Sequence, residues 1–102
     1  MKRARFEIPW KEGLHLRIAA QLVKRAQSFR SSVKLKVNEQ MADARSIFSI
    51  LMLCASLGAM VDIEVAGDDE DDAFASVAAV FNVVDSELPE DLNDDSGDPF
   101  EA

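Results

Sequence analysis

Residues 33–37, Val33-Lys34-Leu35-Lys36-Val37, alternate apolar and basic side chains without a break. Successive side chains of a β-strand point to opposite faces, so this stretch is predicted to be a strand with one apolar face. Residues 61–65, Val61-Asp62-Ile63-Glu64-Val65, alternate in the same way with acids at the polar positions. Each of these strands needs covering on one face only, which is typical of an antiparallel sheet with helices on one side.

Two further strands are predicted outward from these. Residues 3–8 alternate polar and apolar side chains, which places Ala4, Phe6 and Ile8 toward the core. Residues 41–44 follow a predicted turn and are expected to form a short strand.

Three stretches have helical rather than alternating spacing: residues 16–29, 47–55 and 74–84. Ser46 is a good N-cap for the second, because its hydroxyl can accept a hydrogen bond from an amide of the first turn. Gly58 is the predicted stop soon after that helix. The predicted order is therefore βαββαβα, an α+β arrangement.

The composition fits one small globular domain. The chain has 102 residues, of which 48% are hydrophobic and 29% charged. Its longest apolar run, residues 50–55, is far shorter than the roughly 20 residues that span a membrane, so no membrane insertion is expected. Charges interrupt the basic start of the chain, which argues against a signal peptide and predicts a cytoplasmic protein.

The single cysteine, Cys54, cannot form an internal disulfide and is expected to be a packed small hydrophobe. One histidine and one cysteine are too few for a structural zinc site, and no metal or cofactor is predicted.

Charge is segregated along the chain. The formal net charge is −8, yet all 11 lysines and arginines lie in residues 1–45, and residues 46–102 are acidic without a single base. This balance argues against nucleic acid as the main partner.

Residues 1–84 are predicted to form the domain, and residues 85–102, with eight acids, to be a disordered tail. The alternative for this acidic segment is that it shields the basic half of the chain.

The candidate chemistry centres on the only histidine. His15 lies in Gly13-Leu14-His15-Leu16-Arg17, where a glycine-bearing loop meets the first predicted helix. A helix N-terminus offers backbone amides to an anion, and Arg17 adds donors suited to phosphate oxygens. The same positive field disfavours an imidazolium, which leaves a neutral nitrogen able to attack phosphorus. This pattern indicates reversible phosphoryl transfer, and the alternative is an ordinary surface or capping histidine.

Two motifs in register carry a family resemblance. Gly13-Leu14-His15-x-Arg17 resembles the active site of HPr, the histidine-containing phosphocarrier family of the bacterial phosphoenolpyruvate-dependent phosphotransferase system. Arg45-Ser46-Ile47-Phe48-Ser49-Ile50 resembles the family's regulatory serine segment, and the likeness covers residues 3–84. It implies an open-faced β-sandwich, with a four-stranded antiparallel sheet and three helices on one face.

The resemblance also implies roles. His15 would accept phosphate on Nδ1 from phosphorylated enzyme I and pass it to an IIA-type domain, which makes the protein a carrier rather than an enzyme. Arg17 and the first amides of the helix would hold the phosphate. Ser46 would be modified by an HPr kinase/phosphorylase where that enzyme exists, and a monomer is the simplest expectation.

Partner docking is assigned to an apolar set with a polar rim. The resemblance supports Ile47, Phe48 and Leu51 as docking residues, and the alternative is that their helix is simply buried. Gln21 and Lys24 are expected to form the rim. Leu16 stands where the family usually has a small residue, so it adds bulk beside the imidazole and is placed in the docking set. Ile18 stands where the family usually has proline, and it restores an amide to the first turn.

A second function remains open. The same fold could serve as a regulatory binding module that is controlled by phosphorylation of Ser46, with little or no role in sugar transport. The presence of His15 favours the carrier. A small metal or nucleic-acid binder is poorly supported by one histidine, one cysteine and the acidic balance.

Overall fold

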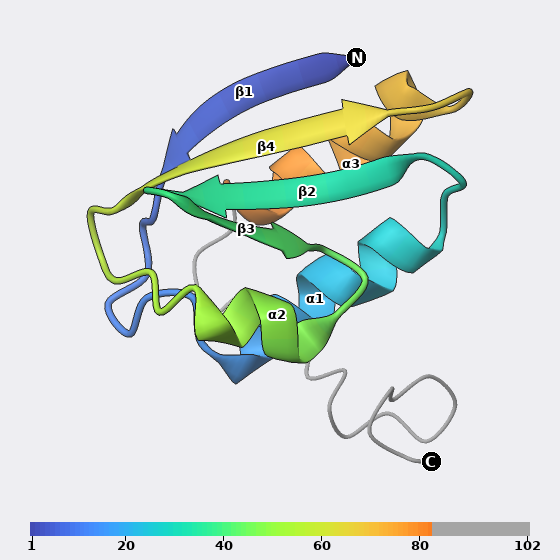
Figure 1. Cartoon of the computed structure of the whole chain (residues 1–102). Helices are drawn as coiled ribbons and strands as arrows, with labels where there is room; N and C mark the ends of the chain where they lie inside the picture. Colours follow the sequence, from blue (N-terminus) through green and yellow to red (C-terminus); the bar gives the residue numbers. More distant parts are fainter. Residues whose placement is uncertain (83–102) are drawn as a thin grey trace, which may run out of the picture.

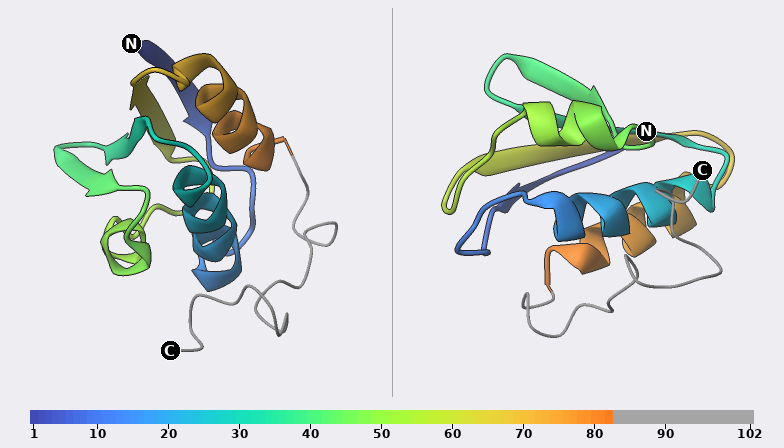
Figure 2. Two further views of the ribbon diagram at one scale, coloured as in Figure 1. Left: turned by 90° about the vertical axis from the view of Figure 1, so that its right-hand side faces the viewer. Right: turned by 90° about the horizontal axis from the view of Figure 1, so that it is seen from below.

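The computed structural model describes residues 1–82 and contains one four-stranded antiparallel sheet (Figure 1). The strands are β1 (Lys2–Glu7), β2 (Ser32–Val37), β3 (Gln40–Asp43) and β4 (Met60–Ala66), in the spatial order β1-β4-β2-β3. The helices are α1 (Leu16–Gln27), α2 (Ile47–Met52) and α3 (Glu70–Val80). The predicted βαββαβα order and open-faced sandwich are confirmed, with the helices on one side of the sheet (Figure 2). Within residues 1–82, no helix has the length and apolar character needed to cross a membrane.

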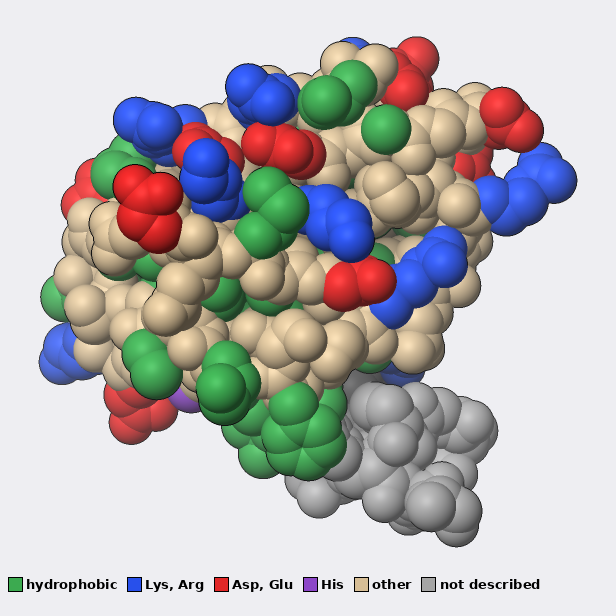
Figure 3. All heavy atoms as spheres, in the orientation of Figure 1, with side chains coloured by type: hydrophobic (Ala, Val, Ile, Leu, Met, Phe, Trp, Pro, Cys, Tyr) green, Lys and Arg blue, Asp and Glu red, His purple; other side chains and the backbone are tan. Residues whose placement is uncertain are grey.

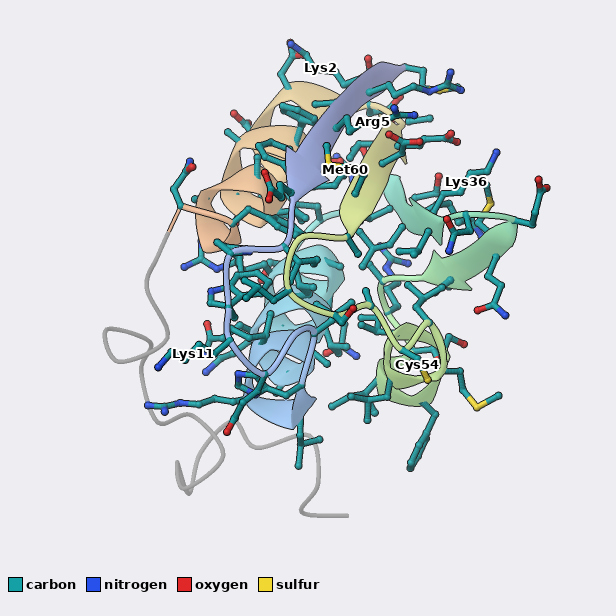
Figure 4. The ribbon with its side chains drawn as sticks, turned by 90° about the vertical axis from the view of Figure 1, so that its left-hand side faces the viewer. Lys2, Arg5, Lys11, Lys36, Cys54 and Met60 are labelled. Atoms are coloured by element: carbon teal, nitrogen blue, oxygen red, sulfur yellow. The ribbon has the colours of Figure 1, made fainter. Side chains whose placement is uncertain are left out.

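The two central strands bury the faces that their alternation predicts. The inward side chains of β2 and β4 are all buried against the helices: Val33, Leu35, Val37, Val61, Ile63 and Val65. Their polar side chains face outward and meet charges of opposite sign on neighbouring strands. Arg5 of β1 contacts Asp62 of β4 at 2.7 Å, and Lys36 of β2 is paired with Asp62 in the register. Arg5, Met60 and Lys36 lie on this outer face in Figure 4.

Helix α1 covers the inner face of the sheet with the residues that its spacing selects. The side chains of Ile18, Ala19, Leu22, Val23 and Ala26 are all buried in the core. The helix ends at Gln27, two residues before the predicted Phe29, and Ser28 caps it. The core face of α1 therefore follows directly from its three-and-four residue spacing.

Helix α2 is shorter than predicted. It ends at Met52, because Cys54 adopts a left-handed backbone with φ of 51° and takes the place that glycine often fills after a helix. The expectation of a helix to Ala55 with a stop at Gly58 is therefore wrong in its end point. The expectation of a packed Cys54 is also wrong, since the thiol side chain is exposed after α2 (Figure 4).

Helix α3 runs antiparallel to α1. Its start is joined to the loop after α1, where Asp69 accepts a hydrogen bond from the amide of Ser31 at 2.9 Å. Its end meets the loop before α1, where the Phe81 ring lies 5.3 Å from that of Trp10. The chain therefore leaves the described domain at the same end as the start of α1 (Figure 2). The predicted domain boundary at residue 84 and the acidic segment 85–102 lie outside the described residues.

Candidate functional site

The loop before α1 is pressed against the loop after α2. Gly13 has a positive φ of 72°, and a β-carbon built on it would lie 2.3 Å from the carbonyl oxygen of Ala55. Only glycine fits this close approach without displacement. The next amide, that of Leu14, donates to the same Ala55 oxygen at 2.8 Å. These contacts fix the backbone that enters His15.

His15 is the N-cap residue of α1. Its backbone is extended, with φ of −89° and ψ of 178°, and its carbonyl accepts the first helical hydrogen bond from Ala19 at 2.9 Å. Its side chain makes no capping hydrogen bond, so the alternative of a capping histidine is not met. The ring is half-buried and its Nε2 atom is buried. The imidazole therefore lies at the start of α1 without capping the helix.

The first turn of α1 follows His15 directly and carries anion-binding groups. The amides of Leu16, Arg17 and Ile18 precede the first helical hydrogen bond, so their N–H bonds point out of the positive end of the helix. The Arg17 side chain, on the same turn, is half-buried. Ile18 itself is fully buried in the core, so its side chain anchors the turn while its amide stays at the helix end.

The two residues expected to form a polar rim differ in how exposed their side chains are. Lys24 is half-buried on α1. Gln21 is only 3% exposed, so it cannot contribute to a solvent-exposed rim, and that expectation is corrected. Spacing along a helix indicates the direction of a side chain, but it does not reveal what covers that side chain.

Exposed apolar side chains gather near the same end of the molecule. Phe48 and Met52 on α2 are each 75% exposed, and Leu16 on α1 is 45% exposed. Ile47 and Leu51 are half-buried and pack against the core. Figure 3 shows hydrophobic side chains at the α2 end of the surface, beside the single histidine. The alternative of a simply buried second helix is therefore wrong, because within α2 only Ile50 is buried. Met52 was not in the predicted docking set, although it lies four residues from Phe48 and is equally exposed.

Ser46 begins α2 as predicted. Its backbone is extended, and its hydroxyl oxygen accepts a hydrogen bond from the amide of Ser49 at 3.3 Å. The preceding Arg45 reaches back with its guanidinium and donates to the carbonyls of Phe29 and Ser31. This guanidinium ties the start of α2 to the loop that follows α1.

Comparison with known proteins shows the family of the chain. The family model PTS-HPr, described as the phosphorylation site of the HPr component of the phosphotransferase system, matches residues 2–82. The chain belongs to the HPr family. Members of this family are phosphocarriers of the phosphotransferase system, and the general role of the chain is that of a phosphocarrier, a carrier rather than a catalyst.

The relatives include carriers with two names. The chain is 40% identical over 70 residues to phosphocarrier protein HPr of Cupriavidus necator, covering 69% of this chain and 79% of that one. It is 38% identical over 77 residues to phosphocarrier protein NPr of Escherichia coli K12, covering 74% and 86%. Among solved structures, HPr-C-His from Thermoanaerobacter tengcongensis has a TM-score of 0.76 at 34% identity, covering 80% and 92%. The relatives of this HPr-family member thus include both HPr and NPr phosphocarriers.

Proposed function

We propose that this protein accepts a phosphoryl group on His15 from phosphorylated enzyme I and passes it to an IIA-type domain. The observation that carries this proposal is the position of His15 at the N-terminus of α1, with a side chain that does not cap the helix. An imidazole beside a set of anion-binding donors is suited to reversible nucleophilic transfer.

Nδ1 is the proposed acceptor atom. Nε2 is buried, so a donor reaches the ring more readily by the edge that carries Nδ1. The Nδ1 lone pair attacks the phosphorus, a new N–P bond forms, and the bond from phosphorus to the enzyme I donor atom breaks with its electron pair returning to enzyme I. Onward transfer is the same step in reverse, with an IIA-type domain as the attacking partner.

Arg17 and the first amides of α1 are proposed to hold the transferred phosphoryl oxygens. Arg17 lies in the first turn of α1, two residues after His15, and the planar fork of a guanidinium suits two phosphate oxygens at once. The three leading amides add neutral donors and the positive end of the helix dipole. Arg17→Lys keeps the charge but loses the fork, so it separates geometry from charge.

The exposed apolar set is proposed as the docking surface for both partners. Its exposed members are Leu16, Phe48 and Met52, near the His15 end of the molecule. Its half-buried members, Ile47 and Leu51, pack against the core. One surface around one acceptor atom allows one partner at a time, which is the behaviour of a carrier. All of these residues come from one chain, so a monomer suffices.

Phosphorylation of Ser46 is proposed as a regulatory step rather than as the main function. The serine lies two residues before Phe48, and a phosphate there would add roughly two negative charges beside the docking surface. An HPr kinase/phosphorylase would be the modifying enzyme. The placement of His15 supports the carrier over a module that is regulated through Ser46 alone.

A two-step relay with purified partners tests the proposal. Labelled phosphoenolpyruvate and enzyme I are mixed with this protein and an IIA-type domain, and label on the IIA-type domain is followed over time. The full chain is expected to pass label onward, and His15→Ala is expected to pass none. Label on the IIA-type domain that survives His15→Ala at the same rate would overturn the proposal.

A further inference from the structure

Helix α2 carries the most exposed side chains of the proposed docking surface, Phe48 and Met52. Only Ile50 among its six residues is buried. A helix of this length is marginal on its own, so its place depends on the contacts at its two ends. Those contacts decide where Phe48 and Met52 stand relative to His15 at the start of α1.

The loop that follows α2 is tied to the start of α1. The amide of Leu14, one residue before His15, donates to the carbonyl of Ala55 at 2.8 Å. Because α2 runs antiparallel to α1 (Figure 1), its own start lies beside the other end of α1. A second tie at that end is needed to fix the direction of α2 along α1, since one tie leaves the helix able to tilt.

The side chain of Arg45 supplies this second tie. Its Nη2 atom donates to the carbonyl of Phe29 and to that of Ser31, the latter at 3.4 Å. Both carbonyls follow the end of α1 at Gln27, where the negative end of the helix dipole also favours a cation. The amide of Arg45 bonds instead to the carboxylate of Asp43 at the end of β3, at 2.9 Å. The guanidinium is therefore the group that links the start of α2 to α1.

The turn that Arg45 contacts is itself held from its other side. The amides of Arg30 and Ser31 donate to the carboxylate of Asp69, each at 2.9 Å. Gly67 lies so close that a β-carbon built on it would fall 2.5 Å from the Ser31 hydroxyl oxygen. The guanidinium thus joins α2 to a turn that is already fixed to the start of α3.

We propose that Arg45 is a positioning residue for phosphoryl transfer, whose guanidinium sets the direction of α2 and so the place of Phe48 relative to His15. The inference rests on the proposed function, in which α2 docks enzyme I near His15. Phe48 is 75% exposed, so the direction of its helix, rather than packing of its ring, fixes its position. The tie acts at the end of α1 that is remote from His15, since twelve helical residues, about 18 Å, separate the two ends.

Amide hydrogen exchange in the free, full chain tests the tie without any partner. Arg45→Ala is expected to speed exchange about tenfold at the amides of Ile50 and Leu53, whose hydrogen bonds to Ser46 and Ile50 close the turns of α2. The amides of β4 are expected to change less than twofold. An equal change in α2 and β4, or no change in α2, would overturn the proposal.

Arg30→Ala is the matched control for the loss of charge. Arg30 is exposed, lies in the turn that Arg45 contacts and takes part in the Asp69 contact only through its amide, which alanine keeps. Arg30→Ala is expected to leave exchange in α2 and affinity for enzyme I within twofold. Effects as large as those of Arg45→Ala would show that net charge, rather than the tie, is responsible, and would overturn the proposal.

Affinity for enzyme I separates positioning from direct contact with the partner. Arg45→Ala is expected to weaken binding about fivefold in the natural chain but less than twofold in a Phe48→Ala background, because the direction of α2 matters less once its exposed ring is gone. Losses that simply multiply in the double variant, as independent contacts would give, would overturn the positioning role. If the natural chain does not bind enzyme I at all, the proposed function fails, while the exchange result still decides whether Arg45 holds α2.

Discussion

The backbone N–H of Leu14 donates to the carbonyl of Ala55 at 2.8 Å, which joins the loop before α1 to the loop after α2. His15 follows directly on one side of this bond, and α2, with Phe48, lies on the other. His15, the proposed acceptor, and the exposed apolar side chains of α2 are therefore held in a fixed relation by backbone contacts rather than by their own side chains.

Gly13→Ala tests this junction. The new methyl group would meet the Ala55 oxygen at 2.3 Å on a backbone with φ of 72°, so both strain and overlap oppose it. Gly58→Ala is the matched control, because Gly58 also has a positive φ but a β-carbon there would meet only the Glu7 carboxylate, at an ordinary contact distance of 3.9 Å. Gly58→Ala is expected to cost about 1–2 kcal/mol of unfolding free energy, and Gly13→Ala roughly 1–3 kcal/mol more, measured by urea unfolding. Equal costs would contradict the close approach at Gly13.

Phe48→Ala and Ile50→Ala separate docking from stability on one short helix. Phe48 is 75% exposed and Ile50 is fully buried. Phe48→Ala is expected to change the unfolding free energy by no more than about 0.5 kcal/mol and to weaken enzyme I binding about tenfold. Ile50→Ala is expected to cost about 2–5 kcal/mol of unfolding free energy. Calorimetric titration and urea unfolding measure the two effects, and unchanged enzyme I affinity in Phe48→Ala would exclude it from the docking surface.

Ser46 has a capping role that is separable from its charge state. Ser46→Ala removes the acceptor for the Ser49 amide and is expected to cost about 1 kcal/mol of unfolding free energy. Ser46→Asn and Ser46→Asp both keep a good N-cap, but only the aspartate adds charge near Phe48. Stability is therefore expected to be similar in these two variants, with slower phosphoryl transfer from enzyme I in Ser46→Asp alone. Equal transfer rates would argue against control by charge at this position.

Asp69 joins the start of α3 to the loop that follows the end of α1, on the side of the helical layer that lies far from His15. Its carboxylate accepts hydrogen bonds from the Ser31 hydroxyl and from the amides of Arg30 and Ser31. The Ser31 hydroxyl, followed by the Arg30 amide, lowers the pKa of Asp69 from 3.8 to about 2. The ionised carboxylate is thus the form that the folded chain favours.

This shift predicts acid sensitivity of the fold. A carboxyl whose pKa is lower in the folded chain stabilises that chain above its unfolded pKa, near 4, and loses the contribution as the pH falls toward 2. Asp69→Asn is therefore expected to lower stability at pH 7 and to flatten its decline between pH 4 and 2. Thermal unfolding across this range measures both effects, with Asp72→Asn as a control from the same helical turn. A decline as steep in Asp69→Asn as in the natural chain would contradict the assignment.

Alternation of apolar and charged residues predicted the sheet, because each of its two central strands buries one face. The inward side chains of segments 33–37 and 61–65 are all buried, as the two-residue period of a strand requires. The clamp between Asp69 and Ser31 was not predictable, since it joins residues 38 apart in the chain. The pairing of Trp10 with Phe81 escaped prediction for the same reason.

Predictions failed where an apolar stretch of sequence continues past a change in backbone conformation. Leu53 to Ala55 are as apolar as α2, but the left-handed conformation of Cys54 ends the helix and exposes the thiol. Gln21 occupies an outward helical position and is nevertheless buried, so periodicity alone misplaced it. The positions of His15 and Ser46 at helix starts were predictable, because glycine, serine and the onset of helical spacing mark those starts in the sequence.

The most direct test of the carrier proposal is the site of phosphate after incubation with enzyme I and phosphoenolpyruvate. Intact-mass measurement and phosphorus NMR together give the number of phosphates and their chemical type. We predict one acid-labile phosphate, on Nδ1 of His15, and none in His15→Ala. A chain that takes no phosphate on His15, yet gains a stable one on Ser46 with ATP and an HPr kinase, would contradict this account.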